Sequence, residues 1–221
     1  MDLSEPIPRP RLHELIRDQV HDAIASGQFV PGEILAEADL ARWLGTSRST
    51  IRTTLVALAD LGLVTLRPGK APRVSSPSPQ TLLKGIEVLA PMWALSAPSA
   101  LGNASEEEVM GYAERVEAAR SRWKSDASVT PHELVTEVRV AFEFLLTRGD
   151  NGLALEASRT IQTRVAHAAR SYVASFDQDG LDRVMSILAT AVATRDALQV
   201  RLAVDDFITL TQELVTRLEQ T

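Results

Sequence analysis

The first third of the chain carries hydrophobic residues at helical spacing in two neighbouring stretches. Residues 38–44 predict a short helix, and a longer helix is predicted to begin after Ser47, a residue type favoured at the N-cap. Gly45 lies between the two and can adopt a positive φ at little cost, as a tight turn requires. The longer helix has one apolar stripe, formed by Ile51, Leu55, Leu58 and Leu61. This pattern predicts a helix-turn-helix.

The flanking sequence completes a larger motif. An apolar stripe upstream predicts one more helix, and Gly62 is predicted to end the longer helix. Residues 63–66 suit a short strand, and residues 68–71, Pro-Gly-Lys-Ala, suit a turn before a second strand. We therefore expect residues 11–74 to form a winged helix-turn-helix of three helices and a small β-hairpin, after a flexible arm at residues 1–10.

Residues 80–221 show helical periodicity and no strand signal. The polar, proline-broken segment 75–79 is predicted to be a linker. Two capping boxes mark helix starts: Ser105 with Glu108, and Thr130 with Glu133. About six helices with short connections predict an all-α antiparallel bundle, so the expected fold class is mainly α.

Single residues give three further expectations for the bundle. Pro91 and Pro98 are predicted to kink or break its first helix, because proline lacks the N–H that an interior helical position donates. Gly180 is predicted to break the chain between two helices. Leu153 is assigned to the buried stripe of the long helix that follows Gly149.

The charge is unevenly distributed along a chain whose net charge is −6. Residues 42–74 hold six Lys or Arg and one acidic residue, Asp60, whereas residues 79–221 hold 14 basic and 20 acidic residues. A basic patch on a helix-turn-helix is the electrostatic footprint of a protein that reads duplex DNA. The alternative is an ordinary helical hairpin with solvated arginines, but cap, turn, stripe, wing and charge all favour the DNA-binding interpretation.

The second helix of such a motif lies in the major groove and presents its N-terminal residues to base edges. The guanidinium fork matches guanine and phosphate, and hydroxyl groups bond to either. We therefore expect Arg48 and Arg52 to contact bases and nearby phosphates. The other candidate DNA-binding residues are Ser47, Ser49 and Thr50 at the helix start, Gly69 and Lys70 in the minor groove, and Arg42 and Arg73 on the backbone.

Residues 15–74 resemble the DNA-binding domain of the GntR family of bacterial transcription regulators. The resemblance rests on Ile24 to Gly27, Pro31-Gly32 followed by Leu35, Leu40-Ala41, Leu44-Gly45, Ser47-Arg48, Ile51-Arg52, Leu55, Leu58, Gly62 to Val64 and Gly69-Lys70. The family usually has Glu-Ala after the second arginine. Thr53-Thr54 stand there in this chain, so Arg52 is expected to lack a neighbouring carboxylate. The resemblance implies a homodimeric regulator, interpreted as a repressor, on an inverted-repeat operator.

A winged helix followed by an all-helical domain resembles the FadR branch of this family, whose C-terminal domain is called FCD. Such domains commonly hold a metal with one Asp and three His. In this sequence, the positions of those four metal ligands are occupied by Val138, Phe142, Met185 and Phe207. The family usually also has an arginine and a glutamate on the first helix of the domain, and those positions fall near Leu89 and Trp93 here. None of these side chains binds a divalent cation. We therefore expect a degenerate FCD domain with no metal and no cofactor.

Two interpretations of the bundle stay open. In one, a small organic effector occupies an apolar cavity with a basic rim. In the other, the same residues fill the core and the domain only dimerises. The second interpretation is favoured slightly, because protein interiors are normally close-packed. The candidate effector-binding residues are Leu89, Trp93, Arg139, Phe142, Arg159, Met185 and Phe207.

The sequence offers no support for catalysis. There is no cysteine, no GxSxG, no HExxH and no phosphate-cradling glycine loop, so we expect no enzyme.

No apolar run is long enough to span a bilayer and no signal peptide begins the chain, so a cytoplasmic location without a membrane partner is expected. The alternative function is a ligand-free DNA-binding, architectural or protein-interaction module whose helical domain only dimerises.

Overall fold

The structure is a computed structural model that describes residues 9–126 and 128–220, and it divides into two compact units that meet between Ser76 and Pro77. Residues 1–8 of the predicted arm lie outside the described residues. Helix α1 (Arg9–Ala25) already includes the last two residues of that arm, which is a correction to the predicted boundary. Proline is tolerated there because the first turn of a helix does not need its missing N–H.

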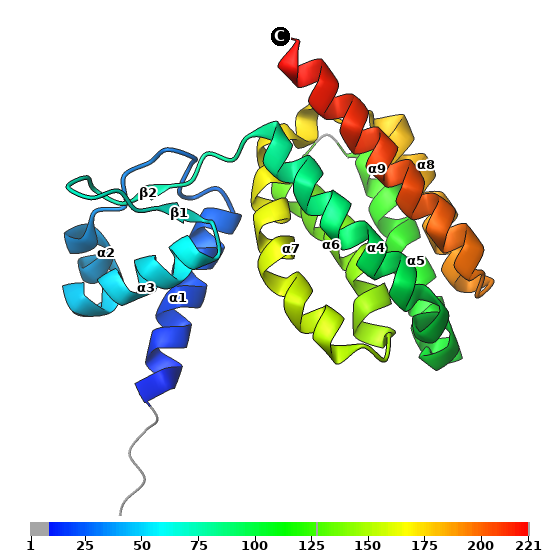
Figure 1. The fold of residues 1–221 in the computed structure, drawn as a ribbon, viewed down its shortest axis with the longest axis horizontal. Coiled ribbons are helices and arrows are strands. Elements are labelled where there is room, and N and C mark those ends of the chain that lie inside the picture. Colours follow the sequence, from blue (N-terminus) through cyan, green and yellow to red (C-terminus); the bar gives the residue numbers. More distant parts are fainter. Residues whose placement is uncertain (1–8, 127, 221) are drawn as a thin grey trace, which may run out of the picture. The chain divides into compact units, whose positions relative to one another are not determined.

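The first unit is a winged helix-turn-helix (Figure 1). Helices α2 (Glu37–Trp43) and α3 (Arg48–Asp60) follow α1, and strands β1 (Val64–Thr65) and β2 (Arg73–Val74) pair antiparallel with Val64 opposite Val74. Its buried core is formed by Ile16, Val20, Ile24, Leu35, Leu40, Ile51, Leu55, Leu58, Leu63, Val64 and Val74. The predicted stripe of α3 is confirmed, with Leu61 half-buried at its end.

Local geometry explains where α3 begins and ends. The backbone N–H of Thr50 donates to Oγ of the N-cap Ser47 at 3.1 Å. Gly45 and Gly62 have φ of 60° and 78°, values that a residue with a Cβ rarely adopts, so the turn before α3 and the stop after it are both confirmed. The start of α3 is therefore held in a defined place relative to α2.

The second unit contains the six predicted helices, joined by short connections (Figure 1). They are α4 (Pro79–Asn103), α5 (Glu106–Ser125), α6 (Pro131–Arg148), α7 (Gly152–Tyr172), α8 (Gln178–Ala193) and α9 (Ala197–Glu219), with a 3₁₀ turn at Val173–Ser175. Helix α4 packs against α6, α7 and α9, and α8 packs against α5 and α9. The bundle core is centred on α4.

Helix α4 is continuous through Pro91 and Pro98, so of the two predicted outcomes, a kink or a break, the break is wrong. Each proline removes a single backbone hydrogen bond. Both prolines lie on the exposed side of the helix, where water can reach the carbonyl groups that lose a donor. The apolar contacts of the opposite face hold the helix together across the two positions.

Two other expectations for the bundle are also wrong. Gly180 lies inside α8, where an added Cβ would come within 2.6 Å of Leu210 Cδ1, so it permits close helix packing rather than a chain break. Leu153 is 79 % exposed, and α7 buries Ser158 and Gln162 instead. The Gln162 side chain donates to Ser158 Oγ at 2.7 Å, which satisfies two polar groups inside the bundle.

Both predicted capping boxes are present. At the start of α6, the N–H of Glu133 donates to Thr130 Oγ1 at 3.2 Å, and the N–H of Thr130 donates to the Glu133 carboxylate at 2.8 Å. The hydrogen bonds from the backbone and side chain of Thr130, with that from Arg122, lower the pKa of Glu133 to about 2.

We predict that Glu133→Ala lowers the melting temperature by a few degrees at neutral pH and that this loss disappears in acid. The folded state favours the carboxylate, so its contribution is complete above the ordinary pKa of 4.5 and is lost as the pH falls toward about 2. Thermal melts of both proteins from pH 7 to pH 3 check this. Glu213→Ala, an exposed position on α9, is the control. A difference that persists unchanged at pH 3 would contradict the assignment.

Candidate nucleic-acid interface

The face of α3 opposite its buried stripe is exposed to solvent. Its exposed residues are Arg48, Ser49, Arg52, Thr53, Val56 and, at the last position of the helix, Asp60. The first three were predicted from their place at the helix start. Thr53 and Val56 were missed, although they lie four residues after Ser49 and Arg52 and so share their face. A valine or threonine methyl group can contact the methyl group of thymine.

Arg52 has a carboxylate partner, so the expectation that it lacks one is wrong. Its Nε donates to Glu37 Oε1 at 3.0 Å and its Nη2 donates to Glu37 Oε2 at 2.8 Å. This bidentate pair, with the Arg52 side chain 72 % exposed, lowers the pKa of the Glu37 carboxyl and raises the pKa of Arg52. Helix α2 thus orients the fork of a guanidinium that belongs to α3, and Nη1 remains available as a donor.

Three hydroxyl groups cluster at the start of α3. The Oγ of Ser47 lies 2.8 Å from Ser49 Oγ and 2.9 Å from Thr50 Oγ1. The backbone N–H groups of the first helical turn and the positive end of the helix dipole lie at the same place. Such a helix start favours a phosphate oxygen.

The wing adds cationic side chains beyond strand β1. Gly69 has a φ of 69° and an added Cβ there would meet no atom within 4 Å, and the N–H of Lys70 donates to the Arg67 carbonyl at 3.1 Å. The side chains of Arg67 and Lys70 are both exposed. Arg67 was missed as a site residue, although it was one of the six basic residues whose clustering indicated DNA binding.

Both arginines that were predicted to contact the DNA backbone, Arg42 and Arg73, form hydrogen bonds within the protein. Arg42 Nη1 donates to Asp39 at 3.0 Å on α2, and Arg73 Nη1 donates to the Gly32 carbonyl at 2.8 Å. Both side chains remain exposed. The Arg73 contact also anchors β2 to the turn at residues 31–32, so its removal is expected to loosen the wing as well as to remove a charge.

Five of the seven candidate effector-binding residues line one cavity of about 60 Å³ between α4, α6 and α7. They are Leu89, Trp93, Arg139, Phe142 and Phe207. The structure does not bring the other two there: Met185 is fully buried elsewhere in the core and Arg159 is exposed on α7.

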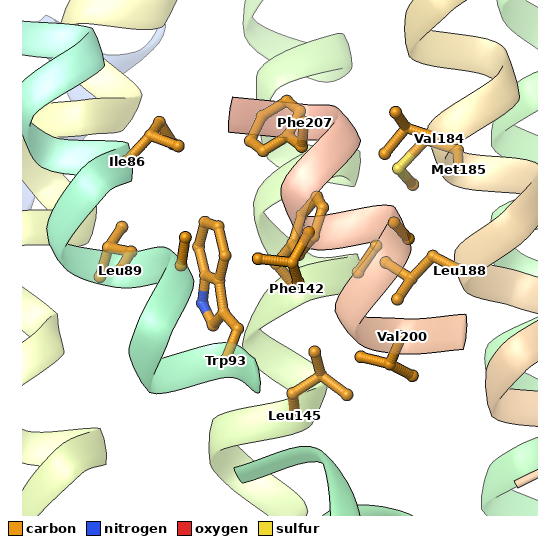
Figure 2. Close-up of a cluster of buried hydrophobic side chains, with 14 of the residues drawn as sticks. Ile86, Leu89, Trp93, Phe142, Leu145, Val184, Met185, Leu188, Val200 and Phe207 are labelled. Carbon is orange, nitrogen blue, oxygen red and sulfur yellow. The ribbon is translucent and has the colours of Figure 1, made fainter. Parts of the chain in front are cut away.

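Three of the residues that line this cavity, Trp93, Phe142 and Phe207, are aromatic, and Figure 2 shows their side chains in the bundle core. The ring of Phe142 stacks on Trp93 with 4.5 Å between centroids and on Phe207 with 4.8 Å. Two of the positions where the FCD resemblance would place metal ligands therefore hold stacked phenylalanine rings. In the part of the chain that the structure describes, no three His, Asp or Glu side chains lie close enough to share a metal ion.

A helix-turn-helix whose second helix exposes arginines, followed by a basic β-hairpin wing, is typical of the winged-helix class of DNA-binding domains. Residues 12–74 match the family model of the bacterial regulatory proteins of the gntR family. The N-terminal domain of this chain is therefore a GntR-family helix-turn-helix domain.

Two curated relatives match the same region. The transcriptional repressor NanR of Klebsiella aerogenes is 31 % identical over 99 residues, which are 44 % of this chain and 38 % of NanR. An uncharacterized HTH-type transcriptional regulator of Mycobacterium tuberculosis is 37 % identical over 86 residues, 38 % of this chain and 36 % of that protein. The chain thus spans under two fifths of the length of these relatives, which are transcription regulators and not enzymes.

Solved structures share the fold over nearly the whole chain. Escherichia coli McbR/YncC superposes with a TM-score of 0.72 at 16 % identity, over 95 % of this chain and 97 % of that one. A GntR transcriptional regulator of Rhodococcus sp. RHA1 gives a TM-score of 0.65 at 17 % identity, over 91 % and 97 %. The mainly helical fold, with an N-terminal winged helix and a helical bundle, is therefore shared with these two solved structures.

Proposed function

We propose that this protein is a sequence-specific regulator of transcription that binds duplex DNA through α3 and the wing. The observation that carries the proposal is that α3 is amphipathic. Its apolar stripe is buried, and Arg48 and Arg52 lie on its exposed face. The hydroxyl groups of Ser47, Ser49 and Thr50 would contact phosphates or base edges. Gly69 and Lys70 would enter the minor groove, and Arg42 and Arg73 would steady the backbone. The bacterial cytoplasm, where the DNA is, is the proposed location.

A homodimer on an inverted repeat follows from one winged helix per chain, because a two-fold protein requires two half-sites related by the same symmetry. Repression is the proposed mode, supported by the name of the NanR relative. Bound over a promoter, such a dimer would exclude the polymerase.

A small organic effector in the bundle is the proposed signal. The cavity walls are apolar, and inside the described bundle Trp93 Nε1 and Arg170 Nε are buried with no hydrogen-bond partner. Burial, together with the nearby charge of Arg139, lowers the pKa of Arg170 to about 10. A thermal-shift screen of neutral and acidic organic compounds tests this. A shift with no compound would favour the alternative, in which the bundle only dimerises.

The DNA-binding proposal is tested by mobility-shift titration. Duplexes from the region upstream of the protein's own gene are compared with random duplexes of the same length and salt concentration. A sequence-specific regulator should prefer its site by about 1,000-fold or more. Equal affinity for both would indicate the alternative architectural function.

We predict that Lys70→Ala mainly changes the salt dependence of binding. A lysine that contacts a phosphate or the minor groove releases about one counterion, so the slope of log affinity against log salt should fall by about 1. Titrations at several salt concentrations measure this slope. Lys124→Ala is the control, because Lys124 pairs with Asp182 in the bundle at 2.9 Å. If the slope for Lys70→Ala equals that of the wild type, the wing does not contact the DNA through Lys70.

A further inference from the structure

One face of α4 is apolar and exposed. The exposed positions between its first turn and Gly102 are Lys84, Val88, Pro91, Leu95, Pro98 and Gly102. Their alternating spacing of four and three residues places them in a single stripe along the helix. The chain has no charged residue between Glu87 and Glu106, so the stripe is uncharged beyond Lys84. Leu95, near its middle, is 72 % exposed.

The other sides of α4 are covered by α6, α7 and α9. A helix at a protein surface normally carries charged residues on its solvent face, and a helix that is apolar all round is normally buried. None of the helices in the described residues has the length and apolar character needed to cross a membrane. We therefore expect this apolar stripe to be buried against another protein surface.

We propose that a second copy of this chain covers the stripe, with the two α4 helices antiparallel across a two-fold axis near Leu95. This rests on the proposed function, which needs two winged helices on one inverted repeat. A two-fold interface places the same patch on both subunits. An uncharged stripe of small and aliphatic residues can face itself without burying a charge.

The charges at the two ends of the stripe select the antiparallel arrangement. Lys84 lies eleven residues before Leu95, and Glu106 lies eleven residues after it. Antiparallel helices would bring each Lys84, which pairs with Glu87 in its own chain, toward the acidic start of α5 in the partner subunit. There Glu106 pairs with Arg195 of its own chain, and Glu107 is exposed. Parallel helices would place like charges together, which is unfavourable.

The contact needs more surface than one stripe, because stable interfaces bury about 800 Å² on each partner. Helix α9 packs alongside α4 (Figure 1) and carries two further exposed leucines, Leu198 and Leu202. These two side chains are the proposed extension of the contact.

Cysteine cross-linking tests the arrangement in the full chain, which has no native cysteine. Leu95→Cys should form a reducible covalent dimer on mild oxidation, because only a residue near the axis brings two equivalent Cβ atoms within disulfide reach. Val88→Cys alone should not, whereas Val88→Cys combined with Gly102→Cys should, since antiparallel helices place position 88 opposite position 102. Gly102 accepts a Cβ without a contact within 4 Å. Leu153→Cys, exposed on α7, is the control.

Sedimentation of a charged variant gives an independent reading. Leu95→Glu should raise the dimer dissociation constant about 100-fold or more, whereas Leu153→Glu should leave it unchanged. A wild-type chain that is monomeric, a Leu95→Glu variant that stays dimeric, or cross-linking at Leu153→Cys equal to that at Leu95→Cys would each overturn the proposal.

DNA binding separates this inference from the proposed function. Leu95→Glu should still bind a duplex with a single half-site as the wild type does, because α3 is untouched. Failure of the cross-link with half-site binding intact would reject only the α4 interface. Failure of half-site binding in both proteins would reject the DNA-binding proposal and leave the cross-linking result standing.

Discussion

Replacing Arg48 with alanine is expected to weaken binding to the operator by about 1–3 kcal/mol, or about 5- to 150-fold. Arg48 is exposed in the first turn of α3, where a guanidinium can reach both a base edge and a phosphate. Binding to random duplex should fall less, because only the operator offers the matching base. Titration of both duplexes at one salt concentration measures the two losses.

Arg52→Ala should cost a similar amount for a different reason. It removes a donor and also leaves the Glu37 carboxylate without its bidentate partner beside the helix proposed to contact DNA. Adding Glu37→Gln to Arg52→Ala should therefore recover part of the affinity. Arg159→Ala, an exposed arginine on α7, is the control. Operator affinity equal to that of the parent in both arginine variants would remove α3 from the interface.

Phe142→Ala is expected to lower the free energy of unfolding of the bundle by about 3–5 kcal/mol. Phe142 is 1 % exposed and stacks on both Trp93 and Phe207. Its loss would remove both ring contacts and enlarge a cavity that the wild-type packing leaves small. Urea unfolding followed by circular dichroism measures the change.

The matched control for this core variant is Leu153→Ala. Leu153 is exposed at the start of α7, so truncation there should change stability by no more than about 0.5 kcal/mol. A Phe142→Ala protein as stable as the control would mean that the ring stack does not hold the bundle together.

Signals within a few residues predicted most of the winged helix. The N-cap Ser47, the turn at Gly45 and the stop at Gly62 each depend on the conformation of one residue, and the structure has all three. The capping boxes of α5 and α6 are local in the same way. The partner of Arg52 was not predicted because Glu37 lies on another helix, 15 residues away in sequence.

Expectations for the bundle failed where tertiary packing outweighs local preference. The prolines of α4 lie on its open side, where the lost hydrogen bonds are tolerated, and Gly180 serves a close approach to α9. Leu153 and Arg159 both face solvent on α7, because the buried side of that helix runs through Ala154, Ser158, Gln162 and Ala166 instead. Periodicity predicted that these helices exist, but it did not fix which side of α7 is inside.

A base-substitution scan of one operator half-site, measured with the wild type and with Arg48→Ala, tests the central claim most directly. If α3 reads bases through Arg48, the variant loses discrimination at one or two neighbouring positions and keeps the rest of the profile. If the variant shows the same relative loss of affinity at every substituted base as the wild type, even with weaker binding overall, the claim that Arg48 reads bases is contradicted.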